Sequence, residues 1–159
     1  MILTLPISSA AISMILGLSG LAAGAATVGC ATQMVGFAVA SYRENKTNGL
    51  LAQGLGTSML QIPNIVRKPR IWLPAIITSA ILGPISSVVL KMESSSIGAG
   101  MGTSGLVGQI AVLDTMGYDI KVIIEILLMH FILPGIISFY ISRFMKKRGY
   151  IKRGDMKLN

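Results

Sequence analysis

The sequence is poor in charge, in aromatic residues and in cysteine. Charged residues make up 13% of its 159 residues and hydrophobic residues 52%, whereas soluble domains carry roughly 25% charged residues. A water-exposed surface with so few charges would aggregate, so we expect the solvent to be a lipid bilayer. The single cysteine, Cys30, excludes an intrachain disulfide. One cysteine and one histidine do not make a metal site, and we predict no metal and no cofactor.

The positive charge is concentrated in two places. One cluster is formed by Arg67, Lys68 and Arg70, and the other fills the last part of the chain from Arg143 to Lys157. Both clusters border apolar stretches, as cytoplasmic loops of membrane proteins do. No basic patch stands apart from the apolar stretches, which argues against nucleic-acid binding. We therefore predict a multi-pass plasma-membrane protein with a cytoplasmic C-terminus.

The first 42 residues contain no charge after the N-terminus until Arg43. A single helix over 2–42 would be about 60 Å long, which is about twice the hydrocarbon thickness of a bilayer. We therefore predict two segments, about 4–20 and 23–42, with a break at 17–20 or at 22–26. The small residues Ser13, Gly17, Gly20 and Gly24 recur every three or four positions, which predicts a tight-packing seam on one helix face.

Two further spans are expected at 71–91 and 121–142. Gly83-Pro84 and Pro134-Gly135 should kink them, and we expect Gly83 to allow close packing as well. With the basic tail in the cytoplasm, both basic clusters fall on one side only if 48–62 enters the membrane without crossing it.

The most informative motif occurs twice. Residues 54–58 read Gly-Leu-Gly-Thr-Ser and residues 100–104 read Gly-Met-Gly-Thr-Ser, each followed by a glutamine. Both lie in segments too short, too polar or too rich in glycine to span. The sequence therefore predicts an all-α integral membrane protein, a helical bundle with two Gly-rich re-entrant or broken segments. These segments flank the span 71–91 in the sequence and approach the membrane from opposite faces.

Paired glycine-rich breaks point to the substrate path of a transporter. Uncharged hydroxyl and amide groups suit a sugar-like solute, and a helix N-terminus there would suit an anion. The alternative is helix packing with local capping by Thr and Ser. The predicted binding residues are Gly54, Gly56, Thr57, Ser58, Gln61, Gly100, Gly102, Thr103, Ser104 and Gln109.

Two ionisable residues fall inside the last span. Glu125 and His130 are functional candidates because charge is costly in a bilayer. The alternative, which we favour, is an ion pair between Lys121 and Glu125, four residues apart on a helix, and a hydrogen-bonded His130 inside the bundle. We predict no catalytic residue and no phosphoryl-accepting residue.

Several stretches carry a resemblance to a known family. Residues 41–45, 51–65, 69–74, 79–84 and 98–109 are similar to phosphotransferase-system EIIC-type membrane proteins, often labelled perfringolysin O regulator or toxin-regulator-like proteins. The resemblance implies a membrane component of a sugar permease that translocates a sugar or a related polar solute. It would be the channel subunit of a sugar phosphotransferase, with soluble phosphotransferase components as partners. The alternative is a non-transporting membrane regulator or structural subunit.

The resemblance also divides the chain. Residues 1–145 are similar to the C-terminal half of the EIIC-type transmembrane domain, and residues 146–159 form a basic cytoplasmic tail. Family members are longer, so a missing N-terminal half or a second copy is expected as a partner. The acidic substrate-loop signature of glucose-type EIIC domains is absent from the sequence.

Overall fold

A computed structural model describes residues 9–158 of the chain. Three helical segments of this part are long and apolar enough to cross a membrane: α2 (Gly20–Ala40), Pro69–Val89 and Ile120–Lys147. The second contains α5 (Leu73–Pro84), and the third contains α8 (Ile120–Ile126) and α9 (Leu133–Lys147). The expected all-α bundle with spans near 23–42, 71–91 and 121–142 is confirmed.

Five shorter α-helices lie outside these spans in the described chain, together with short 3-10 and π-helical turns. The only β-type contact within residues 9–158 is an isolated bridge between Gly20 and Ser94. The short helices are α1 (Ser9–Ile15), α3 (Tyr42–Leu51), α4 (Ile62–Arg67), α6 (Ser96–Met101) and α7 (Val107–Met116).

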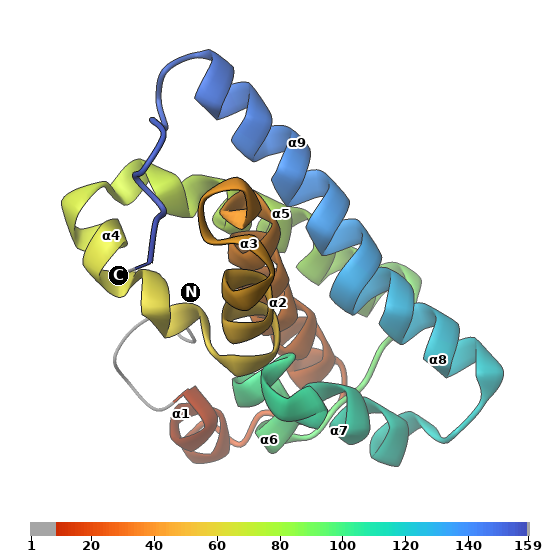
Figure 1. Cartoon of the computed structure of the whole chain (residues 1–159). Coiled ribbons are helices and arrows are strands. Elements are labelled where there is room, and N and C mark those ends of the chain that lie inside the picture. The colour runs from red at the N-terminus through yellow and green to blue at the C-terminus, as the bar shows by residue number, and fades with distance from the viewer. Residues whose placement is uncertain (1–8, 159) are drawn as a thin grey trace.

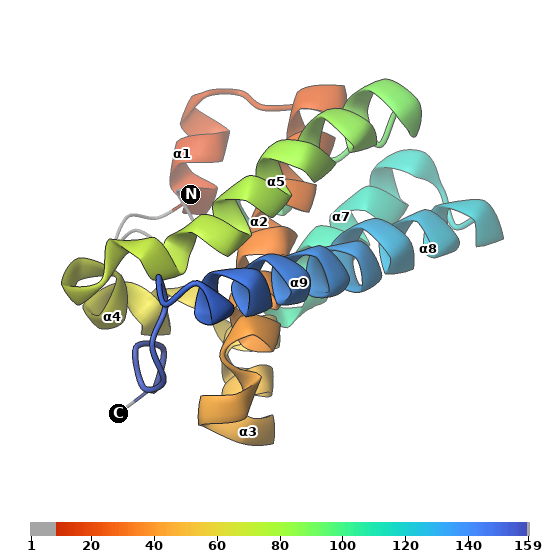
Figure 2. The same cartoon turned by 90° about the horizontal axis from the view of Figure 1, so that it is seen from above.

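Helix α2 forms the centre of the bundle. The most apolar window of α2 is 72% buried inside the protein, against 33% and 39% for the other two spans. Helices α5 and α8–α9 run side by side in opposite directions, and α2 crosses them (Figure 2). Gly36 makes the close crossing possible, because a Cβ there would lie 2.8 Å from Ser138 Oγ and 3.4 Å from Ala75 Cβ. The charge-free, glycine-rich sequence of α2 therefore reflects burial among helices rather than contact with lipid.

The break before α2 lies at 17–20, which is one of the two positions predicted from the sequence. Helix α1 ends at Ile15 and α2 begins at Gly20, with left-handed φ angles of 61° at Gly17 and 56° at Gly20. The part of the predicted segment 4–20 that precedes Ser9 lies outside the described residues. The predicted small-residue seam is wrong, because the break puts Ser13 and Gly24 on different helices. Gly24 instead packs against the backbone of Met92.

Both long outer spans contain a π-helical turn next to a proline. Ile85–Val89 follows Pro84, and Leu127–Ile132 precedes Pro134. A proline cannot donate the backbone hydrogen bond of its helix, and a wider turn accommodates the loss. The expected close packing at Gly83 is wrong, because a Cβ on this residue would meet nothing within 4 Å.

The C-terminal segment, residues 148–158, packs back onto the bundle. Ile151 and Met156 are buried in one apolar cluster with Phe37, Ile65 and Ile71. The segment lies over α4, where Asn64 Nδ2 donates to the Lys157 carbonyl at 2.9 Å (Figure 1). The two basic clusters therefore lie at one end of the bundle, which we call the basic end. The other end holds the bridge between Gly20 and Ser94.

Candidate functional site: two hairpins that meet on α2

The first Gly-x-Gly-Thr-Ser copy lies at the tip of a hairpin that starts from the basic end. Helix α3 and the π-helical turn Ala52–Gly56 run back along α2, so that a Cβ on Gly54 would lie 3.5 Å from Ala38 Cβ. The chain then turns at Thr57, and α4 returns to the basic end. The segment 48–62 thus enters the bundle and leaves on the same side, as the charge pattern predicts.

The second copy lies at the tip of a hairpin from the opposite end. Ser94 N donates to the Gly20 carbonyl at 3.2 Å, and α6 then leads inward to Gly102. A Cβ on Gly102 would lie 2.7 Å from the backbone of Cys30 and Ala31 in the middle of α2. Gly108 N donates to the Gly102 carbonyl at 2.8 Å and closes the turn, and α7 leads outward again.

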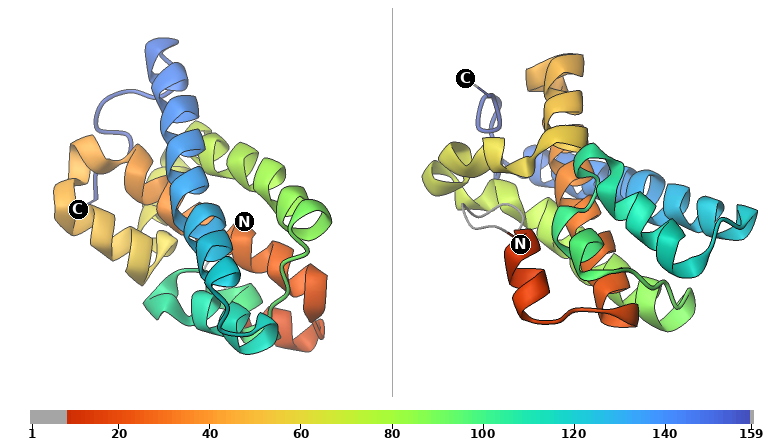
Figure 3. Two further views of the ribbon diagram at one scale, coloured as in Figure 1. Left: turned by 90° about the vertical axis from the view of Figure 1, so that its right-hand side faces the viewer. Right: turned by 90° about the horizontal axis from the view of Figure 1, so that it is seen from below.

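The two tips touch each other. Thr103 Oγ1 donates to the Gly54 carbonyl at 2.6 Å, and Ser104 Oγ donates to the Gly56 carbonyl at 3.0 Å. The two hairpins lie side by side at this point (Figure 3, right). The repeated motif therefore brings two chain segments from opposite ends of the bundle into direct contact beside α2.

The hydroxyl groups of the two motifs differ in exposure. Thr103 and Ser58 are fully buried, whereas Thr57 and Ser104 are half-buried. Thr57 Oγ1 accepts a hydrogen bond from Met59 N at 3.1 Å and caps the following turn. In this arrangement Thr103 joins the tips, and the groups nearest to solvent are Thr57 and Ser104.

The four motif glycines have different surroundings. Gly54 contacts α2, and Gly100 packs against Ala10 of α1 and accepts a hydrogen bond from Ser9 Oγ. Gly56 is exposed and has open space around it. Gly102 has a left-handed φ of 56° and touches α2. Of the four, only Gly56 leaves room for a ligand beside its backbone.

The second tip stores backbone strain. Gly105 and Leu106 follow Gly102 with left-handed φ angles of 53° and 61°. A leucine rarely adopts this conformation, which costs about 1–2 kcal/mol. Strained residues of this kind concentrate at functional sites and switch regions. Nothing in the sequence around Leu106 indicated this conformation.

The glutamines that follow the two motifs do not meet. Gln61 Nε2 donates to Gln53 Oε1 at 2.8 Å and to the Met156 carbonyl at 3.0 Å. Gln109 Nε2 instead lies 2.8 Å from His130 Nδ1. Gln61 therefore ties the first hairpin to the C-terminal segment, and Gln109 ties the second hairpin to the last span.

The pair of Gln109 and His130 leaves two buried polar atoms unused. An amide nitrogen only donates, so His130 Nδ1 accepts and the ring proton is on Nε2. Within the described residues, Gln109 Oε1 and His130 Nε2 have no hydrogen-bond partner. The expectation of a hydrogen-bonded His130 inside the bundle agrees with this geometry, and so does the ion pair of Lys121 Nζ with Glu125 Oε1 at 3.7 Å.

Sequence reasoning missed a polar centre on α2. Gln33 is fully buried, accepts a hydrogen bond from Trp72 Nε1 at 2.9 Å and donates to Ser79 Oγ at 3.2 Å. Trp72 therefore fixes α2 to the start of the second span. The available signal was that Gln33 is the one glutamine in the charge-free stretch 2–42.

No cluster of three metal-ligating side chains occurs in the part of the chain that the structure describes. The candidate site offers hydroxyl, amide and backbone groups, which can donate and accept hydrogen bonds.

Comparison with known proteins gives one match. The model of a family described as "Phosphotransferase system, EIIC" matches residues 1–158 of the chain. No curated protein matches, and no solved structure matches.

Proposed function

The chain belongs to the EIIC family of the phosphotransferase system, and from that premise we propose that it forms part of a permease for a sugar or a related polar solute. The membrane-spanning helices agree with the membrane component that the family supplies. The solute would pass where the two hairpin tips meet beside α2.

The contact between the tips is the observation that carries this proposal. Two segments that enter from opposite ends and meet in the middle leave short paths to both sides of a membrane. Irregular backbone survives at membrane depth only when it is buried in protein or lines a wet cavity. The half-buried hydroxyls of Thr57 and Ser104 and the open backbone at Gly56 offer donors and acceptors of the kind that a sugar hydroxyl pairs with.

The hydrogen bonds between the tips are weak enough for a solute to displace them. A neutral hydrogen bond contributes about 0.5–1.5 kcal/mol net, so the bond of Ser104 to the Gly56 carbonyl is readily exchanged for a bond to a sugar. The buried bond of Thr103 to the Gly54 carbonyl would keep the hairpins aligned meanwhile. A second EIIC unit, an N-terminal half or a second copy, would cover the exposed apolar side chains of the first tip, such as Leu55 and Met59.

The orientation follows from the basic end. Positive charge resists translocation, so the end with Arg67, Lys68 and the C-terminal segment would face the cytoplasm across the plasma membrane. Soluble phosphotransferase components would then approach from this end.

One observation favours a second candidate function, that of a non-transporting regulator or structural subunit. Thr103 is fully buried and its hydroxyl is already used inside the protein. Tips that never separate would only pack the two hairpins together.

The experiment is equilibrium binding of radiolabelled monosaccharides and disaccharides to the full chain in lipid nanodiscs. We expect one sugar to bind, and Ser104→Ala to weaken it about two- to tenfold, because one hydrogen bond is lost. Ser87→Ala is the matched control, since Ser87 Oγ bonds only within its own helix, to the Gly83 carbonyl at 3.3 Å and the Pro84 carbonyl at 3.2 Å. If the wild-type chain binds no sugar of the panel, or if both variants bind as the wild type does, the tips are not the solute site.

A further inference from the structure

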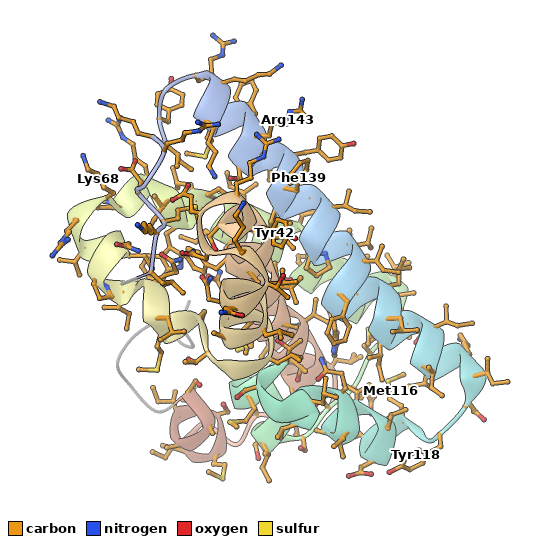
Figure 4. The ribbon with its side chains drawn as sticks, viewed as in Figure 1. Tyr42, Lys68, Met116, Tyr118, Phe139 and Arg143 are labelled. Carbon is orange, nitrogen blue, oxygen red and sulfur yellow. The ribbon has the colours of Figure 1, made fainter. Side chains whose placement is uncertain are left out.

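A groove between α3 and α9 combines an apolar floor with a basic rim. Its mouth is a cavity of 470 Å³ at the basic end, with Val39 of α2, Leu50 of α3 and Phe139 of α9 in its wall. Tyr42 and Arg43 border it from the α3 side, and Arg143 borders it from α9. The side chains of Tyr42, Phe139 and Arg143 lie around the gap between these two helices (Figure 4).

Two apolar cavities, here called branches, adjoin the mouth at Val39. One branch has a volume of 250 Å³ and runs between α2 and the first hairpin toward Leu55, with Phe131 in its wall. The other has a volume of 400 Å³ and follows α9 past Gly135 and Ile136. Val39 lines all three cavities, so both branches adjoin the mouth at this residue.

Four basic side chains line the mouth, and only Lys146 has a carboxylate partner among the described residues. Within residues 9–158 the ion pairs are Lys121 with Glu125 and Lys146 with Glu44. The Glu44 carboxylate also accepts a hydrogen bond from Met156 N at 3.0 Å, so each of its two oxygens has a partner. Exposed Arg43, Arg143 and Lys147 are thus left with an uncompensated positive charge above an apolar floor.

We infer that this groove binds one anionic diacyl phospholipid, with its phosphate on the rim and one acyl chain in each branch. Basic pockets between membrane helices on the cytoplasmic side suit anionic headgroups. In the second branch, Ile132, Ile136 and Tyr140 are exposed on the outside of the bundle, where acyl chains can reach them. A sugar would leave the apolar floor unused. A second copy of the chain would bring the same positive charges to the rim, and like charges repel. The inference does not depend on the proposed transport function.

The test is native mass spectrometry of the full chain, purified in a neutral detergent and titrated with dioleoyl phosphatidylglycerol or dioleoyl phosphatidylcholine. We expect one phosphatidylglycerol to bind in preference to phosphatidylcholine. Arg43→Gln combined with Arg143→Gln should weaken phosphatidylglycerol about 25-fold, since each basic side chain near an anionic lipid contributes about fivefold. Arg67→Gln combined with Lys68→Gln removes the same charge at the same end outside the groove, and should leave the affinity unchanged.

A second variant examines the apolar branches. Leu50→Trp places a larger side chain at the mouth and should weaken both lipids alike without altering the preference for the anionic headgroup. The inference would be overturned if the wild-type chain bound the two lipids equally. It would also be overturned if the groove double variant and the Arg67/Lys68 double variant lost the same affinity for phosphatidylglycerol. Release of the lipid by inorganic phosphate alone would reduce the site to an anion site. A photo-crosslinker at Phe139 that captures protein instead of lipid would assign the groove to a protein partner.

Discussion

Replacing Gly102 by alanine tests whether the second hairpin tip rests on α2. A Cβ at this position would lie 2.7 Å from Ala31 N and from the Cys30 carbonyl carbon. Both are backbone atoms of a buried helix, so the tip itself must retreat. Gly105→Ala is the matched control, because its φ is 53° and its nearest neighbour, Val107 Cγ2, lies 4.0 Å away.

The two substitutions share one cost and differ in the other. A left-handed φ costs alanine about 1–2 kcal/mol at either position. Overpacking against a fixed backbone adds typically about 1–3 kcal/mol, and it applies only at Gly102. We therefore expect Gly102→Ala to lower the free energy of unfolding by about 2–5 kcal/mol and Gly105→Ala by about 1–2 kcal/mol.

Two measurements can distinguish Gly102→Ala from Gly105→Ala. Equilibrium unfolding in mixed micelles gives the stability of each variant, and the rate of maleimide labelling reports on Cys30. Cys30 is buried and its Sγ lies 3.1 Å from the Ala99 carbonyl beneath the tip, so a retreating tip should expose it. Equal stabilities and equal labelling rates in the two variants would show that the tip does not rest on α2, and the arrangement of the candidate site would have to be abandoned.

Three further predictions concern the site, the core and the topology. Thr103→Val should destabilise the chain by about 1–3 kcal/mol in the same unfolding assay, because the buried carbonyl that it bonds is left unpaired; wild-type stability would contradict the contact between the tips. Gly36→Leu should reduce the membrane yield of folded protein strongly and Gly83→Leu only slightly, because only the first site is crowded; similar yields would argue against the crossing of α2. Cysteines introduced at Ser95 and Lys152 should be labelled from opposite sides of the membrane, and labelling from one side would refute the path of the two hairpins.

The spans and the break before α2 could be predicted because they depend on local composition. A run without charge and a bilayer of known thickness determine where helices cross, and glycines near position 17 are poor helix formers. The path of the first hairpin followed from charge placement, because both basic clusters had to fall on one side.

The contacts within the candidate site could not be predicted in the same way. The bond of Thr103 to the Gly54 carbonyl joins residues 49 positions apart, and composition does not determine such a pairing. The two glutamines share a place in the repeated motif, but Gln61 turns toward the C-terminal segment and Gln109 toward His130. Tertiary packing decides these directions.

The packing of the C-terminal segment has a consequence for the order of folding. Asn45 makes hydrogen bonds with both of its side-chain atoms to this segment, donating to the Met156 carbonyl and accepting from Leu158 N, each at 2.8 Å. Gln61 also donates to the Met156 carbonyl. Residues 156–158 leave the ribosome only after the three membrane-spanning segments described above have been synthesised. Until the C-terminal segment has been translated, the side-chain amides of Asn45 and Gln61 therefore lack their partners in it. During that time they can pair only with water or lipid headgroups.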